Sequence, residues 1–177
     1  MARAALFTFV GVAWCVRSLQ SFADPHYTDP VTASDWFAVF SFSAALFATA
    51  LALPLLARMV GGPAVFRVSL VPAVAAALAG LGNLLEDALH VGVAGVFYGA
   101  GAGLTWVGLI AFTVAIAVSG RGRRRLLAAV PAATAVGWSL FESGGGVLVL
   151  VAWLAAAAMA LDRPARTTAQ KAPAITG

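Results

Sequence analysis

The polar residues that could carry chemistry in this sequence gather near the ends of long apolar runs. The clearest group is in the segment GNLLEDALHVG, residues 82–92, where an asparagine, two carboxylates and a histidine follow an apolar stretch. On an α-helix, Asn83, Glu86 and His90 would share one face by their i+3 and i+4 spacing, with Asp87 beside them. Such groups together can bind a cation, transfer a proton or hold a small polar ligand.

Two further segments supply polar side chains that we expect at the same level. Arg17 and Gln20 lie one turn apart in the first apolar run, and Glu142 ends the fifth. An arginine in the outer third of a membrane helix is destabilising unless it pairs or reaches water, so we expect Arg17 to contact Glu86, Asp87 or Glu142. One arginine cannot neutralise three acids, so the remaining negative charge needs water, a proton or a cation.

We call this predicted group the outer cluster: Arg17, Gln20, Asn83, Glu86, Asp87, His90 and Glu142. Two interpretations stay open. The cluster either binds a cation, a proton or a small polar ligand, or it is a structural ion pair beside acids that lie at the water interface. Ionisable groups inside a membrane are usually functional, whereas interfacial ones need not be.

Metal and cofactor motifs are weak in this sequence. Glu86 and His90 have the i, i+4 spacing of helical metal ligands, and His26 lies in a connection at the same end, but there is no HExxH or Cys/His signature. The glycine-rich YGAGAG, residues 98–103, lies inside an apolar run and not after a strand, so it is no nucleotide loop. We therefore predict no metal site and no cofactor.

Composition places the chain among integral membrane proteins. Of its 177 residues, 62% are hydrophobic and only 10% are charged, and the mean hydropathy is +0.94. Soluble domains carry roughly 25% charged residues. The net charge of +4 then reflects membrane topology, not nucleic-acid binding. The 11 basic residues include a single lysine, and with abundant alanine, glycine and valine this bias indicates a prokaryotic source.

Six apolar runs follow one another and predict an all-α polytopic bundle of six transmembrane helices. The runs are continuously apolar, which favours helices over the alternating strands of a barrel. Residues 1–162 form this single domain, and residues 163–177 form a polar tail that we expect to be disordered. The spans are expected at residues 4–22, 36–57, 68–89, 93–119, 126–142 and 147–161.

Charge bias orients the predicted spans. With six crossings, all 11 basic residues except Arg17 fall on one side, and all seven acids except Asp162 fall on the other. The positive-inside rule makes the basic side cytoplasmic. We therefore predict a protein of the prokaryotic plasma membrane with both termini in the cytoplasm.

One alternative concerns the N-terminus. Residues 1–23 resemble a signal peptide, because a basic start and an apolar run are followed by small residues at 21–23. Cleavage there would leave five spans. Arg17 and Gln20 fit better as functional positions inside a retained helix, so we favour six.

Small residues suggest how the helices pack. Gly95, Gly99 and Gly103 repeat at spacing four in the fourth run, and such a face lets helix backbones approach closely. Packing within the chain is the simpler interpretation, and a seam with another copy or another membrane protein is the alternative. The expected partners are therefore the lipid bilayer and a membrane protein or a second copy, and no nucleic acid.

Three classes of function remain for a chain of this kind. It is a non-catalytic membrane protein that binds a ligand at the outer cluster or serves as an accessory subunit, a small solute transporter, or a membrane enzyme that uses the outer carboxylates as acid and base. No nucleophile motif supports an enzyme, and no charged residues continue through the cytoplasmic half to support transport. We favour the non-enzymatic protein.

Overall fold

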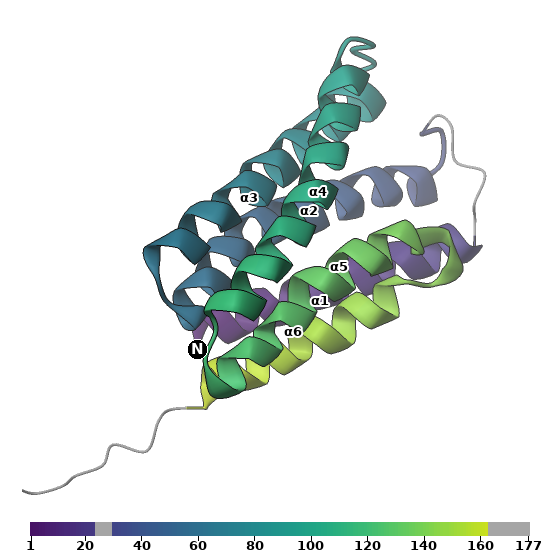
Figure 1. Cartoon of the computed structure of the whole chain (residues 1–177). Helices are drawn as coiled ribbons and strands as arrows, with labels where there is room; N and C mark the ends of the chain where they lie inside the picture. The colour runs from purple at the N-terminus through teal and green to yellow at the C-terminus, as the bar shows by residue number, and fades with distance from the viewer. Residues whose placement is uncertain (24–29, 163–177) are drawn as a thin grey trace, which may run out of the picture.

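A computed structural model describes residues 1–23 and 30–162, and this part of the chain is helical throughout, without strands (Figure 1). The prediction of an all-α chain is confirmed. From the end of α3 onward, short π-helical or 3₁₀ segments, which are labelled η, lie between the α-helices. In chain order the elements are α1 (Ala2–Ala23), α2 (Ala33–Val60), α3 (Pro63–Asn83), η1 (Leu84–Ala88), α4 (Ala94–Ser119), η2 (Gly122–Ala128), α5 (Ala129–Ser139), η3 (Phe141–Ser143) and α6 (Gly146–Leu161).

Four helices are long and apolar enough to cross a membrane: α1, α2, α3 continued through η1, and α4. The fifth predicted run is divided among η2, α5 and η3. The sixth forms α6, whose 16 residues extend about 24 Å at about 1.5 Å per residue, against a hydrocarbon thickness of about 30 Å. Each expected run is thus a helical segment, but only the first four reach spanning length.

Local sequence signals explain where the second and third helices begin. Thr32 and Asp35 form a capping box, in which the Thr32 N–H donates to Asp35 Oδ2 over 2.7 Å and the Asp35 N–H donates to Thr32 Oγ1 over 3.3 Å. Gly61 and Gly62 have φ of 90° and 91°, which favours glycine and lets the chain reverse. Pro63 then occupies the first turn of α3, where no N–H is needed.

The helices pack as two groups joined by α2. The α3–α4 pair forms one group, α1 with α5 and α6 forms the other, and α2 contacts both α1 and α3 (Figure 1). Close approach depends on glycines, because a Cβ at Gly101 of α4 would lie 2.6 Å from the Ala79 nitrogen, and one at Gly108 would lie 2.9 Å from Pro72. Small residues therefore set the α3–α4 spacing, as in membrane bundles.

Two of the three glycines on the predicted face of α4 do not pack against any described part of the chain. Gly99 and Gly103 are exposed, and a Cβ at either would meet no described atom within 4 Å. Gly95 faces the carboxylate of Glu86 and not a helix backbone. For Gly99 and Gly103 the interpretation as helix packing within the described chain is therefore wrong. The glycine of α4 that contacts α3 is Gly101, which follows Gly99 by two positions and so lies about 200° around the helix from it.

The core between the two helix groups is apolar and includes the first helix. Phe7, Trp14, Leu53, Phe112 and Trp153 are all less than 2% exposed. Because α1 supplies two of these side chains and packs on α6 and α2, it is an integral part of the bundle.

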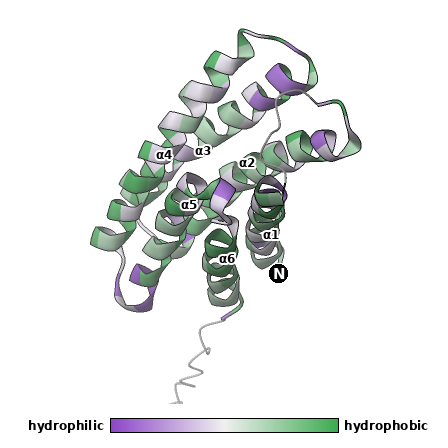
Figure 2. Cartoon of the chain, turned by 90° about the vertical axis from the view of Figure 1, so that its right-hand side faces the viewer, coloured by the Kyte–Doolittle hydropathy of each residue, from purple (hydrophilic) through white to green (hydrophobic). Residues whose placement is uncertain are grey.

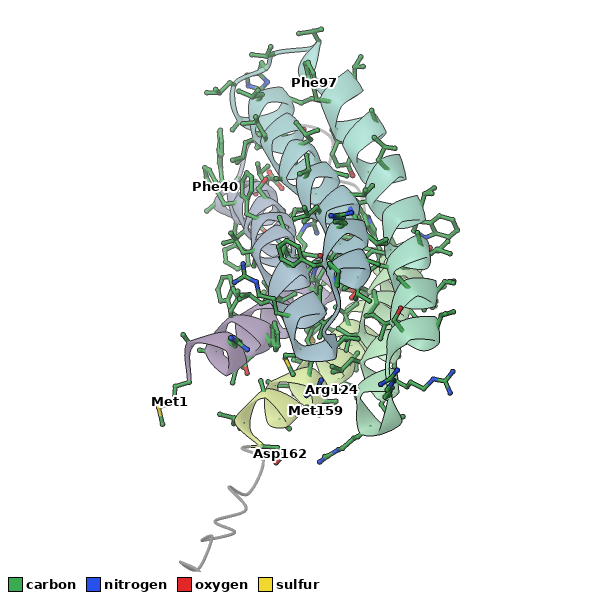
Figure 3. All side chains as sticks on the ribbon, turned by 60° about the vertical axis from the view of Figure 1, so that its left-hand side comes forward. Met1, Phe40, Phe97, Arg124, Met159 and Asp162 are labelled. Carbon is green, nitrogen blue, oxygen red and sulfur yellow. The ribbon has the colours of Figure 1, made fainter. Side chains whose placement is uncertain are left out.

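Outward-facing side chains are also apolar. Phe40 and Phe97 project away from the helices in Figure 3, and each is 53% exposed. In Figure 2 the hydrophobic colour runs along the helices and the hydrophilic colour concentrates at their ends. Apolar residues on both the inner and the outer faces are typical of an integral membrane bundle, because lipid is as apolar as the core.

Charged residues separate toward opposite ends of the bundle. Arg3, Arg58 and Arg124 line one cavity, so the start of α1, the end of α2 and η2 meet at what we call the basic end. Glu86 and Asp87 of η1 follow α3, which starts at the basic end and runs away from it. We call that opposite end the acidic end.

Candidate functional site

Arg17 lies near the C-terminal end of α1 and is only 9% exposed. Its guanidinium carbon is 5.1 Å from the ring centre of Phe141 and 5.8 Å from that of Phe42. A cation at this distance from aromatic rings is attracted by their π-electrons, and the attraction grows when water is excluded. The buried arginine is therefore held partly by aromatic side chains from η3 and α2.

Five aromatic side chains form a continuous floor beside Arg17, which we call the aromatic floor. The ring centres of Trp14 and Trp138 are 5.4 Å apart, and Phe42 lies 5.7 Å from Phe141 and 6.1 Å from Tyr98. These separations fall in the range of favourable edge-to-face and tilted contacts. Because the rings come from α1, α2, α4, α5 and η3, the floor joins both helix groups at the level of Arg17.

Hydrogen bonds from α1 fix two parts of this floor. The Ser18 hydroxyl donates to the Phe141 carbonyl over 2.7 Å and accepts the Gly146 N–H over 3.0 Å, which holds η3 and the start of α6 against α1. The Trp14 indole N–H donates to Thr49 Oγ1 over 2.9 Å. A buried indole N–H needs such an acceptor, so the bond sets the orientation of the ring.

The two adjacent carboxylates reach the same region from η1. This segment is a π-helix, and both Glu86 and Asp87 are half-buried in it. The Tyr98 hydroxyl lies within electrostatic range of Arg17, Glu86 and Asp87. Three ionisable side chains of the predicted cluster are therefore near enough to influence the charge of one phenol. π-Helical turns within longer helices often occur at functional sites.

Glu86 also contacts the beginning of α4. An ideal Cβ at Gly95 would lie 2.5 Å from Glu86 Oε1, so the carboxylate lies directly against the first turn of this helix. The N-cap residue Val93 makes no side-chain cap. A negative charge here stabilises the exposed N–H groups and the positive end of the helix dipole, and Gly95 leaves room for it.

Two other predicted members connect helices instead of facing Tyr98. The Asn83 amide donates to Ser43 Oγ over 3.0 Å and to the Val39 carbonyl over 3.4 Å, which links α3 to α2. The Gln20 amide donates to the Ser34 carbonyl over 2.7 Å and so links α1 to the first turn of α2. Their roles in the structure are those of interhelical connectors.

The predicted common face of Asn83, Glu86 and His90 is wrong. The π-helix ends at Ala88, and His90 is exposed in the following connection with a φ of 54°. The wider π-turn and the early end of the helix break the i+3 and i+4 spacing. Glu142 is likewise exposed, on η3 beside Phe141.

Metal binding gains no support at these positions. Residues 1–23 and 30–162 contain no group of three or more His, Cys, Asp or Glu side chains that could hold a metal ion. His26 lies outside the described residues, as does the tail at 163–177.

Four residues of the site are not predicted from the sequence: Ser18, Phe42, Tyr98 and Phe141. Tyr98 and Phe42 lie in long apolar runs with no periodic signal. Ser18 and Phe141 are neighbours in sequence of Arg17 and Glu142, and that adjacency is the one signal that could have identified them.

The assembled site carries groups that could bind a cation or a small polar ligand. It offers a guanidinium, two carboxylates and a phenol beside an aromatic floor, and its described side chains include no nucleophile with an adjacent base. Searches with protein-family models, among curated proteins and among solved structures give no match to this chain.

Proposed function

We propose that this chain is a small, non-enzymatic, multi-pass membrane protein that binds a small cation, or a small polar ligand with a cationic group, at its acidic end. The observation that carries this proposal is that Arg17 of α1 and the two carboxylates of η1 lie within electrostatic range of Tyr98 of α4, while Phe42 contacts both the Arg17 guanidinium and the Tyr98 ring. Ionisable residues held between membrane helices mark functional sites by default, because burying them is destabilising unless they are matched.

The sign of the ligand follows from the charges around Tyr98. The described residues place two carboxylates and one guanidinium there, which gives a formal charge of −1. Aromatic faces beside the carboxylates favour an organic cation further, since the π-electrons of Phe42 and Tyr98 attract positive charge. We propose both carboxylates as ligand contacts, and Asp87 is the one to test, because replacing Glu86 would also remove its contact with the start of α4.

Six crossings with the basic end in the cytoplasm are the membrane arrangement that we assign. The local bilayer can thin around the short α6 at a modest cost per ångström, and η2, α5 and η3 together supply the fifth crossing. The positive-inside rule orients the protein in a prokaryotic plasma membrane. In a Cys15→Ser background, Gly92→Cys should react with an impermeant maleimide added outside, and Arg121→Cys only after permeabilisation; the reverse pattern would overturn the orientation.

Ligand binding is tested by thermal unfolding of the purified protein in detergent. The chlorides of sodium, potassium, magnesium, calcium and choline are compared at equal ionic strength. We expect one of them to raise Tm in the wild type and in Glu142→Gln, whose carboxylate is exposed, but not in Asp87→Asn. No cation-specific shift in the wild type, or an undiminished shift in Asp87→Asn, would refute the site.

An accessory-subunit role is the second candidate, and the exposed face of Gly99 and Gly103 on α4 favours it. Transport has less support, since the large buried side chains toward the basic end are apolar, including Leu53, Leu56 and Ile116. Co-purification of a stable membrane partner that is lost in Gly99→Leu would favour the accessory role.

A further inference from the structure

A second site lies at the basic end, far along the helices from Tyr98. Arginines from α1, α2 and η2 surround an open cavity of about 640 Å³, to which Arg3, Arg58, Arg123 and Arg124 contribute. Figure 3 places Arg124, Met159 and Asp162 together at this end of the bundle. A cavity of this volume is within the range of small-molecule sites, about 300–1,000 Å³.

Membrane topology alone does not require this convergence. The positive-inside rule needs only positive charge on one side, at any loop position. Arg67 and Arg121 meet that requirement, are exposed, and do not line the cavity. The gathering of four arginines from three elements around this cavity is therefore a feature of how the helices pack, and membrane orientation alone does not account for it.

The lining is strongly positive. Among the residues that the structure describes, four arginines and one acid, Asp162, line the cavity and give it a formal charge of +3. Asp162 Oδ2 is 2.6 Å from Arg123 Nη1, so one arginine is already paired. The others are the groups that an anion would contact.

Two of these remaining arginines are held in place. Arg124 Nη1 donates to the Val60 carbonyl at the end of α2 over 3.4 Å, and the guanidinium carbon of Arg58 is 5.3 Å from the Phe66 ring centre. Both side chains keep further N–H donors for a ligand, because a guanidinium carries five in a planar fork. That fork matches phosphate oxygens in pairs, which a lysine ammonium cannot do.

The floor of the cavity is apolar and joins the core. Leu127 is 1% exposed within the core, and Met59 and Met159 pack against it. The cavity therefore spans the boundary between the apolar bundle and its basic rim, which is the level of lipid phosphates and glycerol esters in a bilayer. Methionine side chains are flexible and adapt to such irregular apolar ligands.

We propose that this cavity binds the phosphate group of an anionic phospholipid, with Arg58 and Arg124 as its main contacts and the glycerol region against the methionines. Basic pockets between membrane helices on the cytoplasmic side are suited to such headgroups. This inference is independent of the ligand site at Tyr98. Inorganic phosphate shares the headgroup chemistry but would not use the apolar floor.

The test measures lipid binding to the full-length protein in a neutral detergent. Phosphatidylglycerol is titrated against phosphatidylcholine, with the rise in Tm as the readout, and inorganic phosphate is titrated without lipid. We expect the wild type to prefer phosphatidylglycerol. Arg58→Gln with Arg124→Gln should weaken that binding about 25-fold, since each arginine near a membrane surface contributes about a fivefold change in affinity.

A matched control separates the cavity from general surface charge. Arg67→Gln with Arg121→Gln removes the same charge from the same end and should keep the preference for phosphatidylglycerol. If the cavity double variant does not fold, the single variant Arg124→Gln should show a loss of about fivefold. An equal loss in the control, no preference in the wild type, or equal stabilisation by inorganic phosphate alone would each overturn the lipid assignment.

Discussion

Replacing Thr49 by valine should destabilise the protein, because Trp14 on another helix then loses the acceptor of its indole N–H. Thr49 Oγ1 accepts the Trp14 indole N–H over 2.9 Å and itself donates to the Ala45 carbonyl over 2.7 Å. Valine has nearly the same shape as threonine but no hydroxyl. The substitution therefore leaves the Trp14 N–H without its acceptor, in a place where the ring is only 1% exposed and water does not reach.

The expected magnitude follows from the cost of a buried donor without a partner. In protein interiors that cost is about 1–3 kcal/mol. Interhelical hydrogen bonds in membranes average about 0.6 kcal/mol, with a maximum near 1.7, because the unfolded state in the membrane also finds partners. Since Trp14 is fully enclosed, we expect Thr49→Val to lower the free energy of unfolding by about 1–2 kcal/mol.

Equilibrium unfolding in mixed micelles, driven by a denaturing detergent and followed by circular dichroism, measures this difference. Thr105→Val is the matched control, because Thr105 is also buried and donates to a carbonyl four residues earlier, over 2.7 Å, but accepts no indole. Its change should stay below about 0.5 kcal/mol. Trp14→Phe should abolish the effect of Thr49→Val, since the donor is then absent.

Two results would refute this reasoning. The first is an equal loss of stability in Thr49→Val and Thr105→Val, which would reflect the change from threonine to valine itself. The second is additivity of Thr49→Val with Trp14→Phe, which would show that the two residues are not coupled.

Three further substitutions test other parts of the packing. Gly101→Ala should lower the free energy of unfolding by about 1–3 kcal/mol, because the new Cβ would meet the α3 backbone. Gly103→Ala should change the free energy of unfolding by less than about 0.5 kcal/mol. Near-equal values would contradict the helix faces assigned to the two glycines. Phe141→Leu keeps an apolar side chain but removes a ring from Arg17, and detergent unfolding should show a loss of about 0.5–2 kcal/mol that becomes smaller in an Arg17→Met background, where only the ring contacts with Phe42 and Trp14 are lost. Thr134→Val removes the acceptor of the buried Trp153 indole N–H and should lower the free energy of unfolding as Thr49→Val does. No change in stability would contradict the rule that a buried indole N–H needs an acceptor.

The helical segments and the separation of charge could be predicted from the sequence, because both depend on local composition. Each apolar run became a helical segment, and the capping box at Thr32 and Asp35 marks the start of α2. The charges at the ends of α2 and α3 likewise follow from where the apolar runs stop. These features require no knowledge of how the helices contact one another.

The rotation of each helix could not be predicted, and the site depends on it. In a soluble bundle, polar residues mark the outer face of a helix. Here both faces of α4 are apolar, so nothing in the sequence distinguishes the buried Gly101 from the exposed Gly99, or turns Tyr98 toward Arg17. For the same reason Phe42 could not be recognised as part of the aromatic floor.

The π-helix at Leu84–Ala88 escaped prediction for a different reason. Its residues would fit an α-helix equally well, and the wider turn lies directly after the point where the end of α3 meets α4. Gly82 and Tyr98 show this contact, since the backbone of α4 leaves no room for a side chain at Gly82. The consequence is that Glu86 reaches the start of α4 while His90 leaves the helix altogether.

Arg17 is the charge that topology explains least. The other basic residues in the described part of the chain lie toward the basic end, where the positive-inside rule is sufficient to account for them. Arg17 lies in the opposite half, where a positive charge opposes the expected orientation, and it is buried. A residue that is unfavourable both for insertion and for burial needs a compensating interaction in the folded protein, and the structure offers two: the rings of Phe42 and Phe141, and the carboxylates near Tyr98. The aromatic rings alone would stabilise any cation at this position. The two carboxylates that lie near Tyr98 together with this arginine are what favours a ligand site over an arginine that only stabilises the fold.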